Sequence, residues 1–361
     1  MHAGLGRGTG LGRGTGCADC VAAKEIKVNT TIQTVTGSIS CEQLGRTLVH
    51  EHVMVGYPGW ESDTLRPGPS RGEALAIADD QVAAIRDLGV VSMIDPCPND
   101  LGRDVELIAE VAQRTGLQII CATGLYKEDQ GGGAYWKFRR DLGGSSDSIA
   151  ELFIKELTEG IGSTGIKAGV IKVATGVPEI TEYEISLLEA AAKASVETGA
   201  PILTHTDAGS LGDQQQKILT DAGVPAHRIL IGHCCGTDDF DYHMSLVEGG
   251  SYVGFDRFGL EILQPDEVRI ASMLRLLEAG CASRLVVSHD SVWCWRGQPI
   301  PAPEAFAPLL EVWNPTHFLT RIVPRLKDGG ATDDQISMML DENPRRYFSG
   351  EPLEPISRAN A

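Results

Sequence analysis

The sequence has no uninterrupted apolar run of the roughly 18 to 20 residues that a membrane-spanning helix requires. Its first thirty residues also lack the apolar core of a secretory signal peptide. It has no cluster of lysine and arginine, and 31 basic against 49 acidic residues give a net charge of −18, which repels a nucleic-acid backbone. We therefore expect a cytoplasmic protein that binds neither a membrane nor nucleic acid.

The cysteines do not form the disulfide framework of a small secreted domain. There are nine of them, an odd number, and several lie inside apolar runs that are typical of buried strands. A chain this long has enough apolar residues to fold without disulfides, so we expect reduced, buried thiols. Cys17 and Cys20 have the spacing of half a zinc site or of a redox pair, but no second pair lies nearby, which disfavours a role for them.

The N-terminal segment has too few large apolar side chains to form a core. The motif Gly-Leu-Gly-Arg-Gly-Thr occurs at positions 4–9 and again at 10–15. Such a composition cannot bury enough apolar surface to offset the entropy that is lost on ordering. We predict a flexible, glycine-rich tail over residues 1–30 and a single domain over residues 31–361.

The rest of the chain alternates short β-rich apolar runs with longer segments of helical periodicity. The apolar runs cover 47–55, 90–97, 118–126, 168–175, 201–207, 228–235, 251–258 and 284–291. This alternation is typical of repeated βα units with a parallel sheet. Because no glycine-rich phosphate-binding motif follows the first run, we predict the α/β class and a closed (β/α)8 TIM barrel rather than a doubly wound sheet. Catalytic groups of such a barrel lie at the C-terminal ends of the strands.

Metal-ligating residue types gather at these predicted strand ends. His50 and His52 stand two residues apart, so a strand would place both side chains on one face. Alone, such a pair, like any single histidine, is often structural. The complete set favours a metal centre: His50, His52, Lys172, His205, His233 and Asp290.

Lys172 lies in the middle of the apolar run Val170-Ile-Lys-Val-Ala174. Burial of an ammonium ion there would be costly, so the lysine requires a compensating interaction or a chemical change. Pairing with a buried acid is the structural alternative to a role in the metal site.

The motifs that carry these residues resemble the phosphotriesterase family of the amidohydrolase superfamily. They are Val49-His50-Glu51-His52, Gly169-Val-Ile-Lys172, Leu203-Thr-His205, Ile231-Gly-His233 and Val287-Ser-His-Asp290, and the resemblance extends over about residues 32 to 348. It implies a binuclear metal centre at the C-terminal face of a (β/α)8 barrel, and a homodimer.

The resemblance also implies how two divalent metal ions would be held. His50, His52 and Asp290 would bind the more buried ion, His205 and His233 the more exposed one, and Lys172, carboxylated by carbon dioxide to N6-carboxylysine, would bridge the two. A shared water would become the hydroxide nucleophile, and Asp290 would accept its proton. We expect zinc, although these ligands also accept cobalt, manganese or iron.

Two residues beyond the predicted ligands are similar to the lactonase branch of this family. Tyr126 follows the third run and Arg257 the seventh. Tyr126 would donate a hydrogen bond to a lactone oxygen, and Arg257 would orient the leaving side of the substrate. The structural alternative for Arg257 is an ion pair with Asp256 or Glu261.

The segment after Asp290 contains Trp293 and Trp295, which we predict to form an apolar wall of the substrate pocket. Packing of this loop against the barrel is the alternative. We expect supporting or structural positions for His289 and for Glu51, which faces away from the ligands, and structural or surface positions for His227, His243 and His317.

These residues predict a metal-dependent hydrolase that opens a small-molecule lactone or related ester, with slower promiscuous phosphotriesterase activity. A dedicated organophosphate triesterase, a carboxylesterase or an amidohydrolase would use the same metal site. A catalytically silent binding barrel is a further alternative, but simple binding does not require this set of ligands.

Overall fold

The structure is a computed structural model that describes residues 29–144, 147–299 and 303–356. The predicted flexible tail lies outside these ranges except for Asn29 and Thr30. The Cys17–Cys20 pair also lies outside them.

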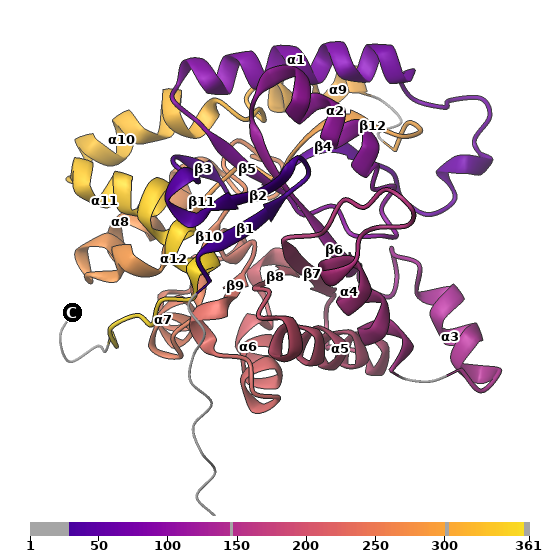
Figure 1. Ribbon diagram of the computed structural model, residues 1–361. Coiled ribbons are helices and arrows are strands. Elements are labelled where there is room, and N and C mark those ends of the chain that lie inside the picture. The colour runs from indigo at the N-terminus through magenta and orange to yellow at the C-terminus, as the bar shows by residue number, and fades with distance from the viewer. Residues whose placement is uncertain (1–28, 145–146, 300–302, 357–361) are drawn as a thin grey trace, which may run out of the picture.

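Eight parallel strands alternate with helices and surround a common axis (Figure 1). In the order in which neighbours pair, they are β11 (Leu285–Val287), β10 (Tyr252–Phe255), β9 (Ile229–Ile231), β8 (Ile202–Thr206), β7 (Val170–Thr175), β6 (Gln118–Leu125), β5 (Ser92–Asp95) and β3 (Thr47–Leu48). Each strand lies within one of the eight predicted runs. The predicted (β/α)8 barrel is therefore confirmed.

A second pair of strands joins the two ends of this sheet. β4 (Glu51–Val55) pairs in parallel with β12 (Ser291–Trp295), and the backbone N–H of Asp290 donates to the carbonyl oxygen of His50 at 2.9 Å. The first and eighth predicted runs are each divided, contrary to the single strands that we expected. The backbone N–H of His50 bonds to the Ser288 hydroxyl, and Asp290 has a left-handed φ of 53°, so regular pairing is interrupted at both positions.

Helices cover the outside of the barrel (Figure 1). They are α1 (Arg71–Asp87), α2 (Val105–Thr115), α3 (Gly133–Asp141), α4 (Ser148–Thr158), α5 (Glu182–Thr198), α6 (Gly212–Asp221), α7 (Phe240–Glu248), α8 (Asp266–Glu278), α9 (Pro303–Leu310), α10 (Val323–Asp328), α11 (Asp333–Ser337) and α12 (Asn343–Ser349). Short 3₁₀ turns occupy Cys41–Gln43, Trp60–Ser62, Asp207–Gly209, Ala226–Arg228, Cys234–Gly236 and Cys281–Arg284, and π turns occupy Phe318–Ile322 and Met338–Glu342.

Local sequence sets the ends of these helices. Ser70 and Glu73 form a capping box at the start of α1, and Thr181 and Glu184 form another at the start of α5. Each box satisfies backbone N–H groups that have no partner within the helix. Gly199, with φ of 78°, ends α5 in the left-handed conformation that glycine adopts without a steric cost.

The core has two layers. The larger lies between the strands and the helices, and the smaller fills the inside of the barrel with side chains such as Val170, Leu230 and Val286. The hairpin of β1 (Thr31–Thr34) and β2 (Gly37–Ser40) contributes Ile32 to this inner cluster and lies in front of the barrel in Figure 1. Each fully buried aliphatic side chain contributes about 1.5–3 kcal/mol, so the filled barrel is a rigid support for groups at its rim.

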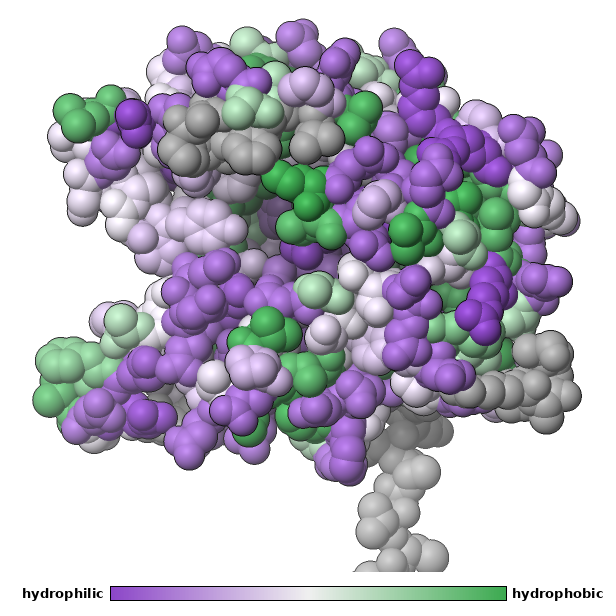
Figure 2. All heavy atoms as spheres, turned by 180° about the vertical axis from the view of Figure 1, so that it is seen from behind, coloured by the Kyte–Doolittle hydropathy of each residue, from purple (hydrophilic) through white to green (hydrophobic). Residues whose placement is uncertain are grey.

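The surface is mainly hydrophilic, and Figure 2 shows apolar side chains on one face as separate islands. None of the described helices combines the length and apolar character that crossing a bilayer requires. All seven cysteines of the described residues are buried and unpaired, as predicted.

Candidate metal centre

A cavity of about 190 Å³ opens at the C-terminal ends of the strands. Nine of the ten residues predicted for the site line it: His50, His52, Tyr126, Lys172, His205, His233, Arg257, Asp290 and Trp295. Residues from seven separate βα units are thus brought together at one end of the barrel, where we predicted an active site.

Three side chains form a compact set of ligand atoms. Nε2 of His50 lies 3.3 Å from Oδ1 of Asp290, and Nε2 of His52 lies 3.2 Å from the same oxygen. Ligands that each bind one ion at 2.0–2.2 Å lie about 3–3.5 Å apart, so this donor set fits a divalent metal ion. Asp290, held by its left-handed backbone, points its carboxylate between the two imidazoles.

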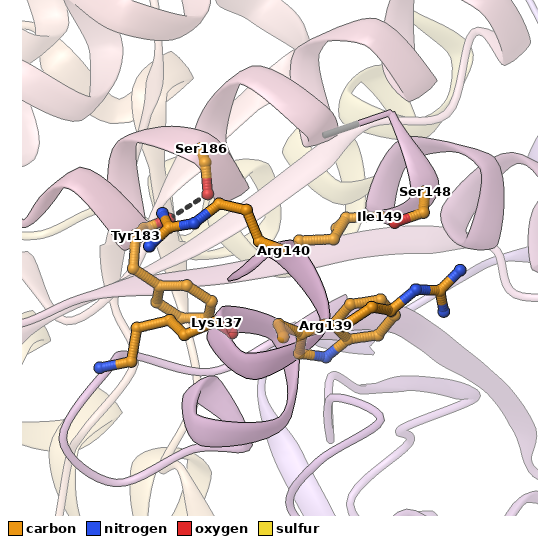
Figure 3. Close-up of a pocket in the computed structure, with 8 residues that line it drawn as sticks. Lys137, Arg139, Arg140, Ser148, Ile149, Tyr183 and Ser186 are labelled. Carbon is orange, nitrogen blue, oxygen red and sulfur yellow. Dashed lines mark hydrogen bonds between the residues drawn. The ribbon is translucent and has the colours of Figure 1, made fainter. Parts of the chain in front are cut away.

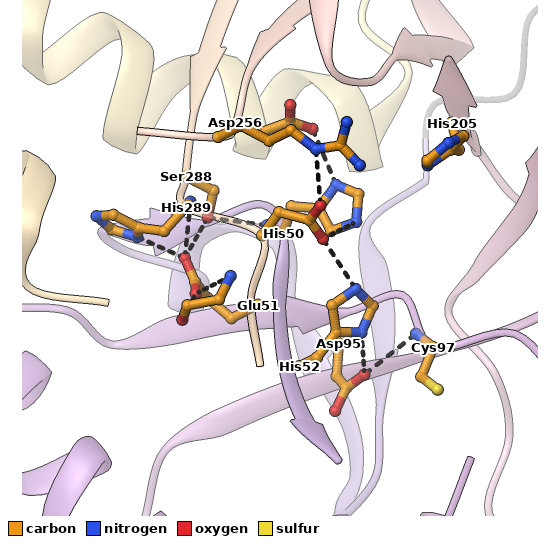
Figure 4. Close-up of polar contacts among 12 residues, drawn as sticks. His50, Glu51, His52, Asp95, Cys97, His205, Asp256, Ser288 and His289 are labelled. Carbon is orange, nitrogen blue, oxygen red and sulfur yellow. Dashed lines mark hydrogen bonds and ion pairs between the residues drawn. The ribbon is translucent and has the colours of Figure 1, made fainter. Parts of the chain in front are cut away.

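Asp256, which we did not predict as part of the site, orients two of the histidines (Figure 4). Its Oδ2 accepts from Nδ1 of His50 at 2.9 Å, and its Oδ1 accepts from Nδ1 of His233 at 3.0 Å. An ionised carboxylate only accepts, so both Nδ1 atoms carry the proton and both Nε2 lone pairs remain available for a metal.

Asp207 orients a third histidine in the same way. Its Oδ1 accepts from Nε2 of His205 at 2.8 Å, while its Oδ2 accepts from the buried Lys127 ammonium at 2.6 Å. This bond assigns the proton of His205 to Nε2 and leaves Nδ1 as the ligand atom. The hydroxyl of Tyr126 lies 3.4 Å from the His205 ring nitrogens.

Lys172 is 2% exposed, and its Nζ lies 3.1 Å from Nε2 of His50. Burial lowers its pKa to about 7, so a large fraction of the amine is neutral at neutral pH. Lys172 forms no ion pair with any carboxylate of the described residues, so the structural alternative, a buried lysine–acid pair, is not observed.

Electrostatics favour the protonation states that metal binding requires. Burial lowers the pKa of His205 to about 3 and that of His233 well below its ordinary value, so both rings are neutral. Burial alone would raise the pKa of Asp290, but the Arg257 guanidinium and a hydrogen bond from His52 hold it well below its usual range. The cavity therefore offers neutral imidazoles at His205 and His233 beside an ionised carboxylate. At His52, burial lowers the pKa but hydrogen bonds to Asp290 and Asp95 hold it well above its ordinary value, so metal binding there displaces a proton.

Arg257 pairs with Asp290 rather than with Asp256 or Glu261, the alternative that we considered. Its Nε donates to Oδ2 of Asp290 at 2.8 Å, and the side chain is 12% exposed. The guanidinium is therefore fixed at the edge of the candidate metal site.

The prediction that Trp293 lines the pocket is wrong. The chain continues as β12 after Asp290: Val292 lines the cavity, while Trp293 packs in the outer core and donates to the Ser291 hydroxyl. Trp295 lines the cavity and stacks on Tyr57, with ring centroids 6.3 Å apart. The remaining apolar lining comes from residues that we did not predict: Val55, Tyr57, Pro98, Leu101, Leu260, Leu263, Val292 and Trp313.

Glu51 and the other histidines lie outside the cavity. Glu51 accepts hydrogen bonds from Ser288, His289 and Ser291, and so ties the first strand to the eighth (Figure 4). His243 donates to the Cys234 carbonyl oxygen, and His317 pairs with Asp266. His227 also lies away from the cavity lining.

A smaller cavity of about 60 Å³ lies outside the barrel, against α3, α4 and α5 (Figure 3). Its lining is basic and aromatic: Trp136, Lys137, Arg139, Arg140, Ser148, Ile149, Tyr183 and Ser186. It contains no histidine, cysteine or carboxylate, so it is not a metal site.

Changing Asp256 to asparagine is expected to weaken metal binding by about 10- to 100-fold with little change in shape. The amide would donate to Nδ1 of one histidine, which moves that ring's proton to Nε2 and removes a ligand lone pair. Asp266→Asn is the matched control, because Asp266 is also buried and bonded to a histidine, His317, away from the cavity. Competition with a fluorescent chelator measures both affinities, and equal losses in the two variants would contradict the role of Asp256.

Comparison with known proteins agrees with this arrangement. A model of the phosphotriesterase family matches residues 30–348. The chain is 36% identical over 330 residues to a phosphotriesterase homology protein of Mycobacterium tuberculosis, covering 88% of this chain and 97% of that protein. It is 34% identical over 316 residues to an aryldialkylphosphatase of Saccharolobus solfataricus, covering 86% and 97%.

Solved structures from Deinococcus radiodurans have the same fold. An organophosphorus hydrolase is 42% identical, with a TM-score of 0.86 over 90% of this chain and all of that one. A mutant described as a phosphotriesterase-like lactonase is 43% identical, with a TM-score of 0.85 over 88% of this chain and all of that one. The chain therefore belongs to the phosphotriesterase family of metal-dependent hydrolases.

Proposed function

We propose that this protein is a binuclear metal-dependent hydrolase that opens lactones or closely related carboxylic esters. The observation that carries the proposal is the position of Tyr126 and Arg257, which line the cavity together with all six candidate ligands. A phenol and a fixed guanidinium supply directional donors for the two oxygens of an ester, while the wall of Leu101, Leu260 and Trp295 suits an apolar substituent.

In this proposal His50, His52 and Asp290 would hold one ion, His205 and His233 would hold the second, and Lys172, as a carbamate, would supply ligands to both. Two bound zinc ions, or cobalt, manganese or iron in their place, supply an activated water and polarise the substrate carbonyl. Asp290 accepts the proton from the attacking water. Tyr126 donates to the substrate oxygen, and Arg257 both orients the leaving side and restrains the Asp290 carboxylate.

The carbamate is supported by the surroundings of Lys172. Its amine is buried, and burial lowers its pKa to about 7, so a large fraction of it is neutral at neutral pH and can attack carbon dioxide. The amine adds to carbon dioxide and loses one proton, and the anionic carbamate that results would offer oxygen ligands to metal ions where an amine offers none.

The reaction is tested with a panel of lactones of varied ring size and chain length beside aryl phosphotriesters, using enzyme loaded with zinc, cobalt or manganese. We expect kcat/KM for the best lactone to exceed that for the best triester by on the order of 10²-fold, because Tyr126 and Arg257 are placed to donate hydrogen bonds to the oxygens of a planar ester group. The reverse ranking would favour a dedicated triesterase, the activity named for two of the relatives, and a preference for amides would favour an amidohydrolase.

Metal content distinguishes any of these enzymes from a silent binding barrel. The proposed centre requires two equivalents of metal per chain, whereas a barrel that binds none after supplementation would be a binding module.

We also retain a cytoplasmic homodimer as a proposal. Exposed apolar side chains on α3, Tyr135 and Phe138, and at its C-cap, Leu142, support the dimer.

A further inference from the structure

Glu51 lies between the two histidines of the first strand, and its side chain is turned toward Ser288 and His289 (Figure 4). It is completely buried, and its carboxylate accepts five hydrogen bonds. The donors are the hydroxyls of Ser288 and Ser291, Nδ1 of His289, and the backbone N–H groups of His289 and Ser291. Glu51 therefore holds the segment on both sides of the candidate ligand Asp290.

These donors fit the ionised form of Glu51, because a protonated acid would turn its own O–H against one of them. His289 does not supply a balancing charge. Its Nε2 accepts from the backbone N–H of Phe318 at 2.9 Å, so the ring has a single proton, on Nδ1, and is neutral. No lysine or arginine of the described residues pairs with Glu51. An anion is costly to bury without a cation, so its presence here calls for a reason beyond packing.

The backbone around Asp290 supplies that reason. β11 ends at Val287 and β12 begins at Ser291, and between them Asp290 has a left-handed φ of 53°, which is unfavourable for a residue with a side chain. Backbone N–H groups beside such an irregular residue need acceptors when they are buried. The N–H groups of His289 and Ser291 donate to the Glu51 carboxylate at 3.0 and 3.3 Å. This side chain thus takes the place that strand carbonyl groups would have in a regular sheet.

The same contacts bring Asp290 to the first strand. Its backbone N–H donates to the carbonyl oxygen of His50 at 2.9 Å. The Ser288 hydroxyl donates to Glu51 at 2.7 Å and accepts from the backbone N–H of His50 at 3.0 Å. With the two strand ends held in this way, Oδ1 of Asp290 lies 3.3 Å from Nε2 of His50 and 3.2 Å from Nε2 of His52.

We propose that Glu51 is a positioning residue for Asp290. It stabilises the left-handed turn that presents the Asp290 carboxylate to His50 and His52, and so sets the affinity for the ion that these three ligands would hold. The inference rests on the proposed function, because that ion belongs to the proposed binuclear centre. Glu51 thereby affects hydrolysis without contact with the substrate or the metal.

The Glu51→Gln variant tests this role through stepwise metal binding, measured by competition with a chelator. Glutamine has one acceptor oxygen, and its NH2 group would face donors, so it cannot hold the turn. We expect one of the two dissociation constants to rise about 10- to 100-fold, as for other groups that orient metal ligands, while the second stays unchanged. The constant that rises should be the one that also rises in Asp290→Asn.

Glu184→Gln is the matched control for the loss of a buried carboxylate. Glu184 is 2% exposed and accepts from backbone N–H groups, including that of Gly176 at 3.0 Å, but it does not line the cavity. This variant should keep both dissociation constants. An equal rise in Glu184→Gln would overturn the inference, because the effect would then reflect general destabilisation.

Ser291→Ala separates position from charge, because it removes one donor to Glu51 and leaves the net charge unchanged. The same dissociation constant should rise by about 2- to 10-fold, the equivalent of one ordinary hydrogen bond. This variant also decides the question if Glu51→Gln does not fold. Wild-type affinity for both ions, in either Ser291→Ala or Glu51→Gln, would overturn the inference.

A crystal structure of metal-free Glu51→Gln gives a readout that needs neither metal nor activity. Asp290 should leave the left-handed region, and its Oδ1 should move away from His50 and His52. An unchanged Asp290 would overturn the inference even when the wild type binds two ions. If the wild type binds no metal, the proposed function fails, but the position of Asp290 in this variant still decides the role of Glu51.

Discussion

Replacing Lys172 with alanine is expected to remove bound metal and hydrolysis together, with a loss of activity on the order of 10³-fold or more, because the metals supply several kcal/mol of transition-state stabilisation. Lys172 is buried and lines the cavity, and its amine lies 3.1 Å from Nε2 of His50. Alanine leaves neither an amine for the carbamate nor an anion to link two ions. Elemental analysis after metal supplementation and the rate of lactone hydrolysis should fall in parallel.

Lys167→Ala is the control for this substitution, because Lys167 lies on the approach to the same strand, β7, and does not line the cavity. It should keep its metal and its activity. Equilibration of the wild type with isotope-labelled bicarbonate should also give a carbamate signal in the NMR spectrum that Lys172→Ala lacks. Full metal occupancy in Lys172→Ala would rule out a bridging role for this residue.

Changing Asp290 to asparagine is expected to cost a similar factor, on the order of 10³-fold in kcat/KM. The amide preserves the shape of the side chain, but it removes the anion that lies 3.2 Å from His52 and 3.3 Å from His50. It also removes the acceptor for the proton of the attacking water. Metal content, kcat and KM measured for one lactone distinguish the loss of metal binding from the loss of the proton acceptor. When a high metal concentration restores full occupancy, any activity still missing is due to the lost proton acceptor.

The Arg257→Ala variant tests whether Asp290 acts as a metal ligand and proton acceptor or only as the partner in an ion pair. It removes the Arg257–Asp290 contact but leaves the Asp290 carboxylate in place. We expect Arg257→Ala to retain both metals and to raise KM, whereas Asp290→Asn loses metal. If both variants retained metal and lost activity equally, Asp290 would act only by holding Arg257.

Much of the candidate site could be predicted because metal-ligating residue types occur at the strand ends, where this fold places its active site. The order of the eight strands follows from the alternation of apolar runs, and strand ends meet at one rim, so His205 and His233 could be placed together from sequence. Asp256 and Asp207 had the same signal, since each directly follows a strand. They were missed because a carboxylate that orients a histidine stands at no characteristic distance from it in the sequence.

The apolar lining was harder to predict. Tyr57 and Trp313 lie in connecting segments without periodicity, and only the folded loops bring them to the cavity. Trp293 and Trp295 look equivalent in sequence. Two residues apart on a regular strand, they would share a face, yet only Trp295 lines the cavity, and no local sequence pattern records this difference.

The β4–β12 pair has a consequence for the order in which the protein is built. Glu51 and Ser288, whose side chains bond beside this pair, are 237 residues apart, so His50 and His52 meet Asp290 only when the two ends of the barrel join. Closing so long a loop is among the slowest steps open to the chain. During synthesis, His50 and His52 are made long before Asp290, so this set of ligands cannot assemble until nearly the whole sequence has emerged. Metal uptake at this site would therefore indicate that the barrel is complete.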